Sequence, residues 1–252
     1  MPKFCANLTW LFTELPFLER FAAAKEAGFD AVEVLSAYDV NAQDVVNALS
    51  RSELQMVLIN CPPPNYTGGD PGFAAVPALQ DRFRRDFTRA LRYAKTLRAH
   101  HLHILSGAAE GPEAEAVFID NLRWAAAQAP GQSLTIEPIN TETKPGYFLN
   151  DFDMARRIVL AVDAPNLCLQ FDTFHAAKIT GDVQSTWDAM RDITAHIQVA
   201  QMPDRGEPDS GAFDFRAFFH QLDRTGYAGW VSGEYQPRKT TKEGLGWMDG
   251  FK

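Results

Sequence analysis

The sequence has no long hydrophobic run, few cysteines and no excess of positive charge, and each absence excludes a class of protein. No stretch approaches the roughly 18 to 20 consecutive apolar residues of a transmembrane helix, and the first residues carry acidic side chains where a signal peptide is apolar. We therefore expect a cytoplasmic protein with no membrane partner. The 252 residues are 46% hydrophobic and 22% charged, which supplies enough apolar material for a core and does not fit a disordered chain.

The cysteines and the net charge exclude two further kinds of site. Cys5, Cys61 and Cys168 are an odd number, and their spacing matches neither a zinc knuckle nor a Cys-x-x-Cys pair, so we predict reduced core or near-site residues. A formal net charge of -8 argues against a nucleic-acid partner. The densest basic run, residues 82–98, has helical spacing with apolar residues on another face, which is typical of a solvated helix surface.

Short apolar or β-branched runs alternate along the chain with longer segments of 3.6-residue periodicity. The eight predicted strands are residues 4–8, 31–35, 55–60, 101–106, 133–137, 168–172, 195–200 and 229–234. The helical segments between them are residues 15–27, 41–51, 80–99, 113–128, 151–162, 186–191 and 215–225. Strand followed by helix, repeated, predicts parallel strands joined by right-handed crossovers.

The length of the chain selects one architecture among those with parallel strands. Eight units average about 32 residues each, close to the ~30 residues of one βα unit, and the total matches the ~250 residues of a closed barrel. We therefore predict an α/β fold, a single (β/α)8 TIM barrel over residues 1–252. A doubly wound open sheet is the alternative, but it usually has a Gly-rich phosphate turn after its first strand, where this chain has Asn7-Leu8-Thr9-Trp10.

One connection, residues 61–78, is far longer than the others. Loops of this length without secondary structure of their own are usually functional or disordered. It follows the third predicted strand and so leaves the carboxyl-terminal face of the barrel, where such barrels carry their active sites. We interpret it as a lid or a wall of the substrate pocket, with a mobile surface excursion as the alternative.

Polar side chains stand at the ends of the last four predicted strands. Glu137, Asp172, Gln198 and Glu234 follow apolar residues at intervals of 35, 26 and 36 residues, so one such group recurs in each βα unit. In a parallel barrel the four would converge at one mouth. Three carboxylates in one low-dielectric cavity repel each other unless a cation neutralises them, and an oxygen-only set favours Mg2+ or Mn2+ over Zn2+. Taken singly, each residue could instead be a capped or solvated strand end.

Five further polar residues lie near this mouth or inside the predicted barrel. His175, in the loop after Asp172, is placed to bind a substrate oxygen, and Arg205 to clamp a substrate oxyanion. His103 is the better of two strand histidines to point inward. Glu33 could pair with an arginine or orient a ligand, and His196 is predicted to be structural.

Five segments together resemble the hydroxypyruvate isomerase family of xylose-isomerase-like barrels, which includes 2-oxo-tetronate isomerases and is related to ketose 3-epimerases. The segments are Glu137-Pro138-Ile139-Asn140, Phe171-Asp172-Thr173-Phe174-His175, His196-Ile197-Gln198-Val199-Ala200, Pro203-Asp204-Arg205-Gly206-Glu207-Pro208 and Gly233-Glu234-Tyr235. The resemblance runs almost from end to end. It implies a small oxo acid or sugar as substrate and, because family members are commonly oligomeric, a homo-oligomer.

The resemblance also implies roles for the strand-end residues. Glu137, Asp172, Gln198 and Glu234 would ligate the metal, with Glu137 and Glu234 doubling as the proton-transfer pair. Moving a carbonyl between adjacent carbons requires a proton to leave one carbon and return to the next through an enediolate, whose charge a divalent cation stabilises. Return of the proton to the same carbon would make the enzyme an epimerase.

The remaining site predictions concern substrate binding. His175 and Arg205 are implied by the resemblance, and we add His103, Asn60 and Trp10, where Trp10 would narrow the pocket or stack on a sugar. The rivals to an isomerase are an endonuclease of the same architecture, which would need more histidine ligands and a basic groove, and a sugar-binding relative without turnover.

The chain departs from the family pattern at two arginine positions, which are Leu79 and Glu142 here. If either arginine contacts a substrate carboxylate in relatives, this enzyme should favour a neutral sugar.

Overall fold

The computed structural model describes residues 1–62, 65, 68, 72–209 and 211–251, and these form a closed barrel of parallel strands. The strands are β1 (Lys3–Asn7), β2 (Ala31–Val34), β3 (Gln55–Cys61), β4 (His101–Ile104), β5 (Ser133–Ile136), β6 (Leu167–Asp172), β7 (Thr194–Val199) and β8 (Trp230–Gly233). Each strand pairs with the next, and β8 closes the ring on β1. The predicted barrel is confirmed, and the open sheet is excluded.

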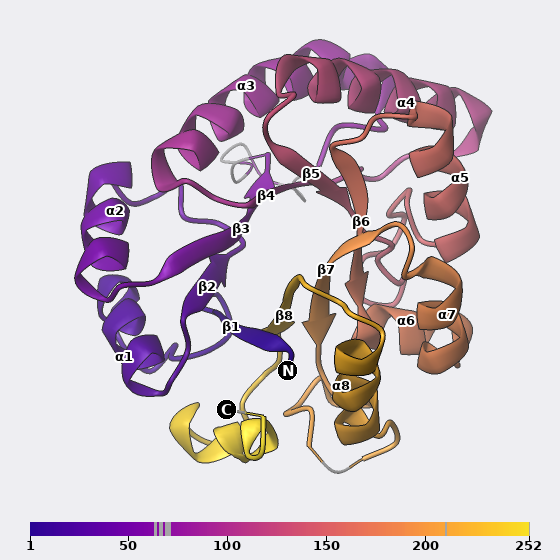
Figure 1. Cartoon of the computed structure of the whole chain (residues 1–252). Coiled ribbons are helices and arrows are strands. Elements are labelled where there is room, and N and C mark those ends of the chain that lie inside the picture. The colour runs from indigo at the N-terminus through magenta and orange to yellow at the C-terminus, as the bar shows by residue number, and fades with distance from the viewer. Residues whose placement is uncertain (63–64, 66–67, 69–71, 210, 252) are drawn as a thin grey trace.

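Figure 1 shows the strands as an inner ring surrounded by helices. The helices are α1 (Arg20–Glu26), α2 (Ala42–Arg51), α3 (Gln80–Leu97), α4 (Gly111–Gln128), α5 (Phe152–Val162), α6 (Thr173–Thr180), α7 (Val183–Met190) and α8 (Phe215–Arg224), with 3-10 turns η1 (Phe17–Glu19), η2 (Pro77–Leu79) and η3 (Lys242–Met248). Aspartate or asparagine side chains cap several helices by accepting a backbone N–H of the first turn. These caps are Asn41, Asp151, Asp172, Asp182 and Asp214.

Two of these caps explain where the sequence prediction was wrong. His175 was placed at the start of a loop, but it lies in α6, because the Asp172 side chain accepts the N–H of Phe174 at 2.7 Å and starts a helix directly at the strand end. Similarly, α7 begins three residues before the predicted segment because Asp182 caps it. Tertiary contacts and caps, rather than periodicity, set both boundaries.

The barrel strands are buried on both faces, which is why they read as apolar runs rather than as alternating patterns. All four residues of β2 are buried, for example. The basic run of residues 82–98 lies on α3, which buries Phe83 and Phe87 on its other face, as predicted. In the part of the chain that the structure describes, no helix combines the length and hydrophobicity that crossing a bilayer requires.

The C-terminal turn η3 closes the molecule beside β1, α8 and β8 (Figure 1). The ring of Trp247 meets the rings of Phe4 and Phe219, at centroid distances of 5.0 and 5.8 Å. The long connection 61–78 begins at the end of β3 and leads into η2. Residues 63–64, 66–67 and 69–71 lie outside the described part of the chain, so the prediction that this connection forms a lid or wall rests on the sequence there.

Candidate active site at the mouth of the barrel

A cavity of about 330 Å3 opens where the carboxyl ends of the strands meet. Most of the predicted site residues line it, namely Trp10, Asn60, Glu137, His175, Gln198, Arg205 and Glu234. The other two, His103 and Asp172, are buried and contact lining residues. A larger hollow of about 520 Å3 lies between α2 and α3, but its charged residues Glu53 and Arg98 are exposed, whereas the carboxylates of the mouth are buried.

Asp172 and Glu234 meet through a shared cation. The Nη2 atom of Arg205 lies 3.2 Å from an Asp172 oxygen and 3.1 Å from Oε1 of Glu234. The guanidinium also lies over the rings of Trp10 and Phe174, at 4.8 and 5.0 Å. Burial alone would lower the pKa of Arg205, but the surrounding carboxylates raise it above its usual value. Arg205 is therefore a fixed positive charge that partly neutralises the site.

Even with Arg205 present, Glu137 and Glu234 retain their protons more strongly than free glutamates do. Burial, together with the charges of Asp172 and Glu234, raises the pKa of Glu137 well above its usual value. Burial also raises the pKa of Glu234 to about 8, against the opposing effect of Arg205. Negative charge is thus in excess at the mouth, which is the environment that favours either a bound cation or a bound proton.

Two glutamine residues order the carboxylate site from below. Gln170 donates from Nε2 to Glu137 at 3.1 Å and to Oε1 of Gln198 at 2.6 Å. The Nε2 of Gln198 in turn donates to Glu33 at 2.7 Å, so Gln170 and Glu33 hold the two ends of the Gln198 amide. Sequence reasoning missed Gln170, although its position two residues before Asp172 places both on the same face of β6.

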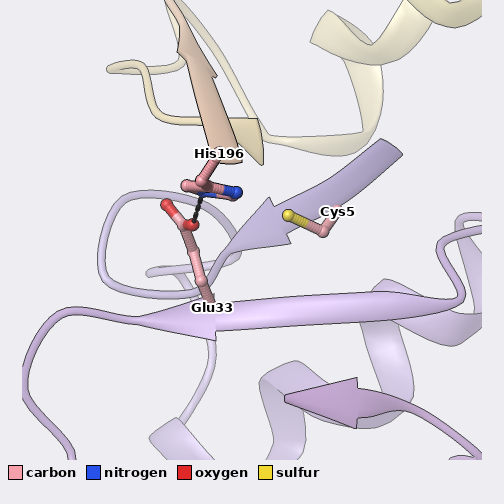
Figure 2. Close-up of side chains that lie close together, drawn as sticks. All are labelled: Cys5, Glu33 and His196. Carbon is pink, nitrogen blue, oxygen red and sulfur yellow. Dashed lines mark hydrogen bonds and ion pairs between the residues drawn. The ribbon is translucent and has the colours of Figure 1, made fainter. Parts of the chain in front are cut away.

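Glu33 is the centre of a second buried cluster, beneath the mouth. Figure 2 shows Cys5, Glu33 and His196 converging from β1, β2 and β7, with His196 bonded to Glu33 at 2.6 Å. Asn7 also donates to Glu33, at 2.7 Å. Burial, with the charge of Glu33, raises the pKa of Cys5 well above its usual value, so its thiol keeps its proton and is a poor metal ligand. The cluster is a structural network that holds Gln198.

This network bears on the two roles predicted for Glu33, pairing with an arginine and orienting a ligand. In the described ranges no arginine contacts Glu33, because the histidine and amide donors occupy its oxygens. It does orient Gln198, the residue predicted to be a metal ligand. His196 is fully buried in this network, in line with the predicted structural role, and the three cysteines are free thiols as expected.

Substituting Glu33 by Ala is expected to destabilise the fold by about 3 to 5 kcal/mol, because it leaves three buried donors without an acceptor. Urea unfolding followed by circular dichroism measures the change. The matched control is Asp30→Ala, which removes an exposed partner of Lys25 and should cost about 1 kcal/mol or less. Equal losses in the two variants would contradict the role assigned to Glu33.

The two site histidines are neutral. Burial lowers the pKa of His175 to about 4 and that of His103 to about 3. The backbone N–H of Asn140 donates to Nδ1 of His175 at 3.3 Å, which leaves the ring proton on Nε2. Although His175, Asp172 and Glu137 have potential ligand atoms within 4.8 Å of one another, this tautomer makes His175 a hydrogen-bond donor rather than a ligand.

The remaining predicted contacts lie on the cavity wall. Trp10 donates from Nε1 to Glu234 at 3.1 Å, so it positions that carboxylate as well as narrowing the pocket. The Oδ1 atom of Asn60 is buried, has no hydrogen-bond partner among the described residues and could accept from a ligand hydroxyl. His103 points inward, with Nε2 3.6 Å from Glu137.

The two positions at which family arginines are replaced lie elsewhere. Leu79 belongs to η2, and neither it nor Glu142 is among the described residues that line the cavity. Glu142 is exposed and pairs with Lys178 at 2.6 Å. The preference for a neutral sugar, which depends on such an arginine contacting a substrate carboxylate in relatives, therefore stays a prediction.

Comparisons with known proteins agree with this architecture. The family model for the xylose isomerase-like TIM barrel matches residues 21–251. A 2-oxo-tetronate isomerase of Cupriavidus necator is 40% identical over 100% of this chain and 99% of its own, and the hydroxypyruvate isomerase of Escherichia coli K12 is 33% identical over the full length of both. A crystal structure described as a family 2 AP endonuclease from Brucella melitensis is 40% identical, with a TM-score of 0.96 over both whole chains.

Proposed function

This chain belongs to the xylose isomerase-like TIM barrel family, and from that premise we propose that it is an isomerase of a short oxo acid. The reaction would move a carbonyl group between neighbouring carbons, an intramolecular oxidation and reduction. The proposal depends chiefly on one observation: two buried glutamates with raised pKa values, Glu137 and Glu234, open into the same cavity. A 2-oxo-tetronate or hydroxypyruvate is the substrate that the full-length relatives favour.

The two glutamates suit the transfer of a proton. They enter the cavity from β5 and β8, on different sides of the barrel. A carboxyl group with a pKa near neutrality accepts and returns a proton with little energetic cost in either direction. One glutamate would remove the proton from the hydroxyl-bearing carbon, and the other would deliver a proton to the former carbonyl carbon. The hydroxyl proton moves to the other oxygen, which completes the exchange without any external oxidant.

The donor set fits a divalent cation. Glu137, Asp172, Gln198 and Glu234 would hold it, because these are hard oxygen donors in a site with excess negative charge. Glu33 fixes the Gln198 amide by accepting from its Nε2, and Gln170 donates to both the Gln198 oxygen and Glu137. When bound, Mg2+ or Mn2+ would polarise the substrate carbonyl and stabilise charge that develops on its oxygen. His175 would donate from Nε2 to a substrate oxygen, and Arg205 would keep the carboxylates oriented.

The experiment is an NMR assay in deuterated water with Mn2+ or Mg2+ present, offering 2-oxo-tetronate, hydroxypyruvate and the neutral ketose erythrulose separately. We expect conversion of at least one oxo acid, with solvent deuterium entering at the carbon that receives the proton. Exchange that leaves the carbonyl in place and inverts one carbon would indicate an epimerase instead. No conversion of any of the three compounds would contradict the proposal.

The description of the Brucella melitensis structure makes DNA cleavage the second activity to measure. The basic residues of α3 belong to the outer ring of helices, whereas the mouth carries buried carboxylates that would repel a phosphodiester backbone. We therefore expect no cleavage of a duplex with an abasic site under the conditions of the isomerase assay. Cleavage that depends on Asp172 would overturn this expectation.

A further inference from the structure

One cation on the cavity wall has no anionic partner. Lys144 lies in the connection between β5 and α5 and lines the cavity beside Thr143. Its side chain is half-buried, and among the residues that the structure describes no carboxylate pairs with it. A lysine on a cavity wall without a counter-charge is a place where a ligand anion gains a charge-assisted hydrogen bond.

Arg205, the other cation among the described lining residues, is already paired with carboxylates of the site. Arg205 contacts both Asp172 and Glu234 and is packed against two aromatic rings. A substrate carboxylate approaching Arg205 would also meet those two carboxylates. Lys144 lines the same cavity and pairs with no carboxylate of the described residues.

Lys144 lies on the same cavity wall as Thr143 and His175, neither of which carries a negative charge. Lys178 provides the contrast within the same region, because it pairs with Glu142 outside the cavity.

We propose that Lys144 binds the carboxylate of the substrate and thereby selects oxo acids over neutral sugars. The inference rests on the proposed isomerase function and adds the residue that sets its substrate class. The carboxylate end of the substrate would lie toward the β5–α5 connection, which leaves its carbonyl and hydroxyl carbons to face Glu137 and Glu234.

The experiment uses a matched pair of compounds in which a CH2OH group replaces the carboxylate, namely 2-oxo-tetronate and erythrulose. In Lys144→Gln, KM for 2-oxo-tetronate should rise about tenfold or more, while KM for erythrulose changes by less than about twofold. Lys144→Arg should retain most of the affinity for the acid. Lys178→Gln, which alters an equivalent lysine outside the cavity, should change neither value.

Calorimetry separates this inference from the isomerase proposal. The non-isomerising acid erythronate should bind the wild type at least about tenfold more tightly than erythritol does, and Lys144→Gln should abolish that difference. An unchanged preference for erythronate in the folded variant would overturn the role of Lys144, whatever the enzyme turns over. Failure of the wild type to isomerise any compound would instead refute the proposed function, and the binding comparison would still decide on Lys144.

Discussion

Glu137→Gln and Glu234→Gln should each lower kcat by about a hundredfold to ten-thousandfold, because each removes one of the two groups proposed to carry the proton. An amide has nearly the shape of the carboxylic acid but neither accepts nor returns a proton at neutral pH. Steady-state assays with the preferred oxo acid measure the loss. Both variants should keep the fold, since Glu137 and Glu234 lie at the ends of strands and line the cavity.

Deuterium exchange distinguishes the two roles. The variant that keeps the proton-abstracting glutamate should still wash solvent deuterium into the substrate without converting it, whereas the other should do neither. Glu142→Gln is the matched control, because Glu142 is an exposed glutamate that pairs with Lys178, and its kcat should match that of the wild type. Retained turnover in both active-site variants would refute the proton-transfer pair.

Removing divalent cations should abolish turnover, and adding Mn2+ or Mg2+ should restore it. Polarisation of a carbonyl by a metal ion is worth several kcal/mol, so the metal-depleted enzyme should retain less than about one hundredth of the activity. Asp172→Asn should weaken Mn2+ binding more than tenfold, because the substitution removes one negative charge from the proposed ligand set. Electron paramagnetic resonance of free Mn2+ measures the binding. Full activity after chelation would contradict the proposed metal dependence.

The affinity for Mn2+ should rise with pH. Burial raises the pKa of Glu234 to about 8, so in the metal-free protein this group is largely protonated at neutral pH, and burial also makes Glu137 hold its proton to a higher pH than a free glutamate does. A cation must displace those protons, and its affinity should therefore rise with pH by up to about tenfold per pH unit for each proton released. The rise should weaken above about pH 8 as Glu234 ionises by itself. A binding constant independent of pH would show that these carboxylates are not ligands.

The barrel and the position of its mouth were predictable from local pattern. Apolar runs and helical periodicity recur in each unit, and all eight strands form within two residues of the predicted ends. The polar residues at or next to the ends of β6, β7 and β8 stand out for the same reason, because a parallel strand buried on both faces tolerates polarity mainly near its end. The sequence alone did not predict α6, because the residue that caps this helix, Asp172, was interpreted as a metal ligand and not as a helix cap.

The contacts between side chains of different strands depend on the strand register, which no local sequence pattern encodes. The register places Asp172 beside Gln198, and it is the closure of β8 on β1 that brings Trp10 to Glu234. Arg205 joins carboxylates from two different strands, and Glu33 gathers donors from β1 and β7. The composition and spacing of the residues thus determined the class of fold and the presence of an acidic mouth. Only the tertiary structure decided which charges there are paired within the described part of the chain, because pairing depends on distances between segments far apart in the chain.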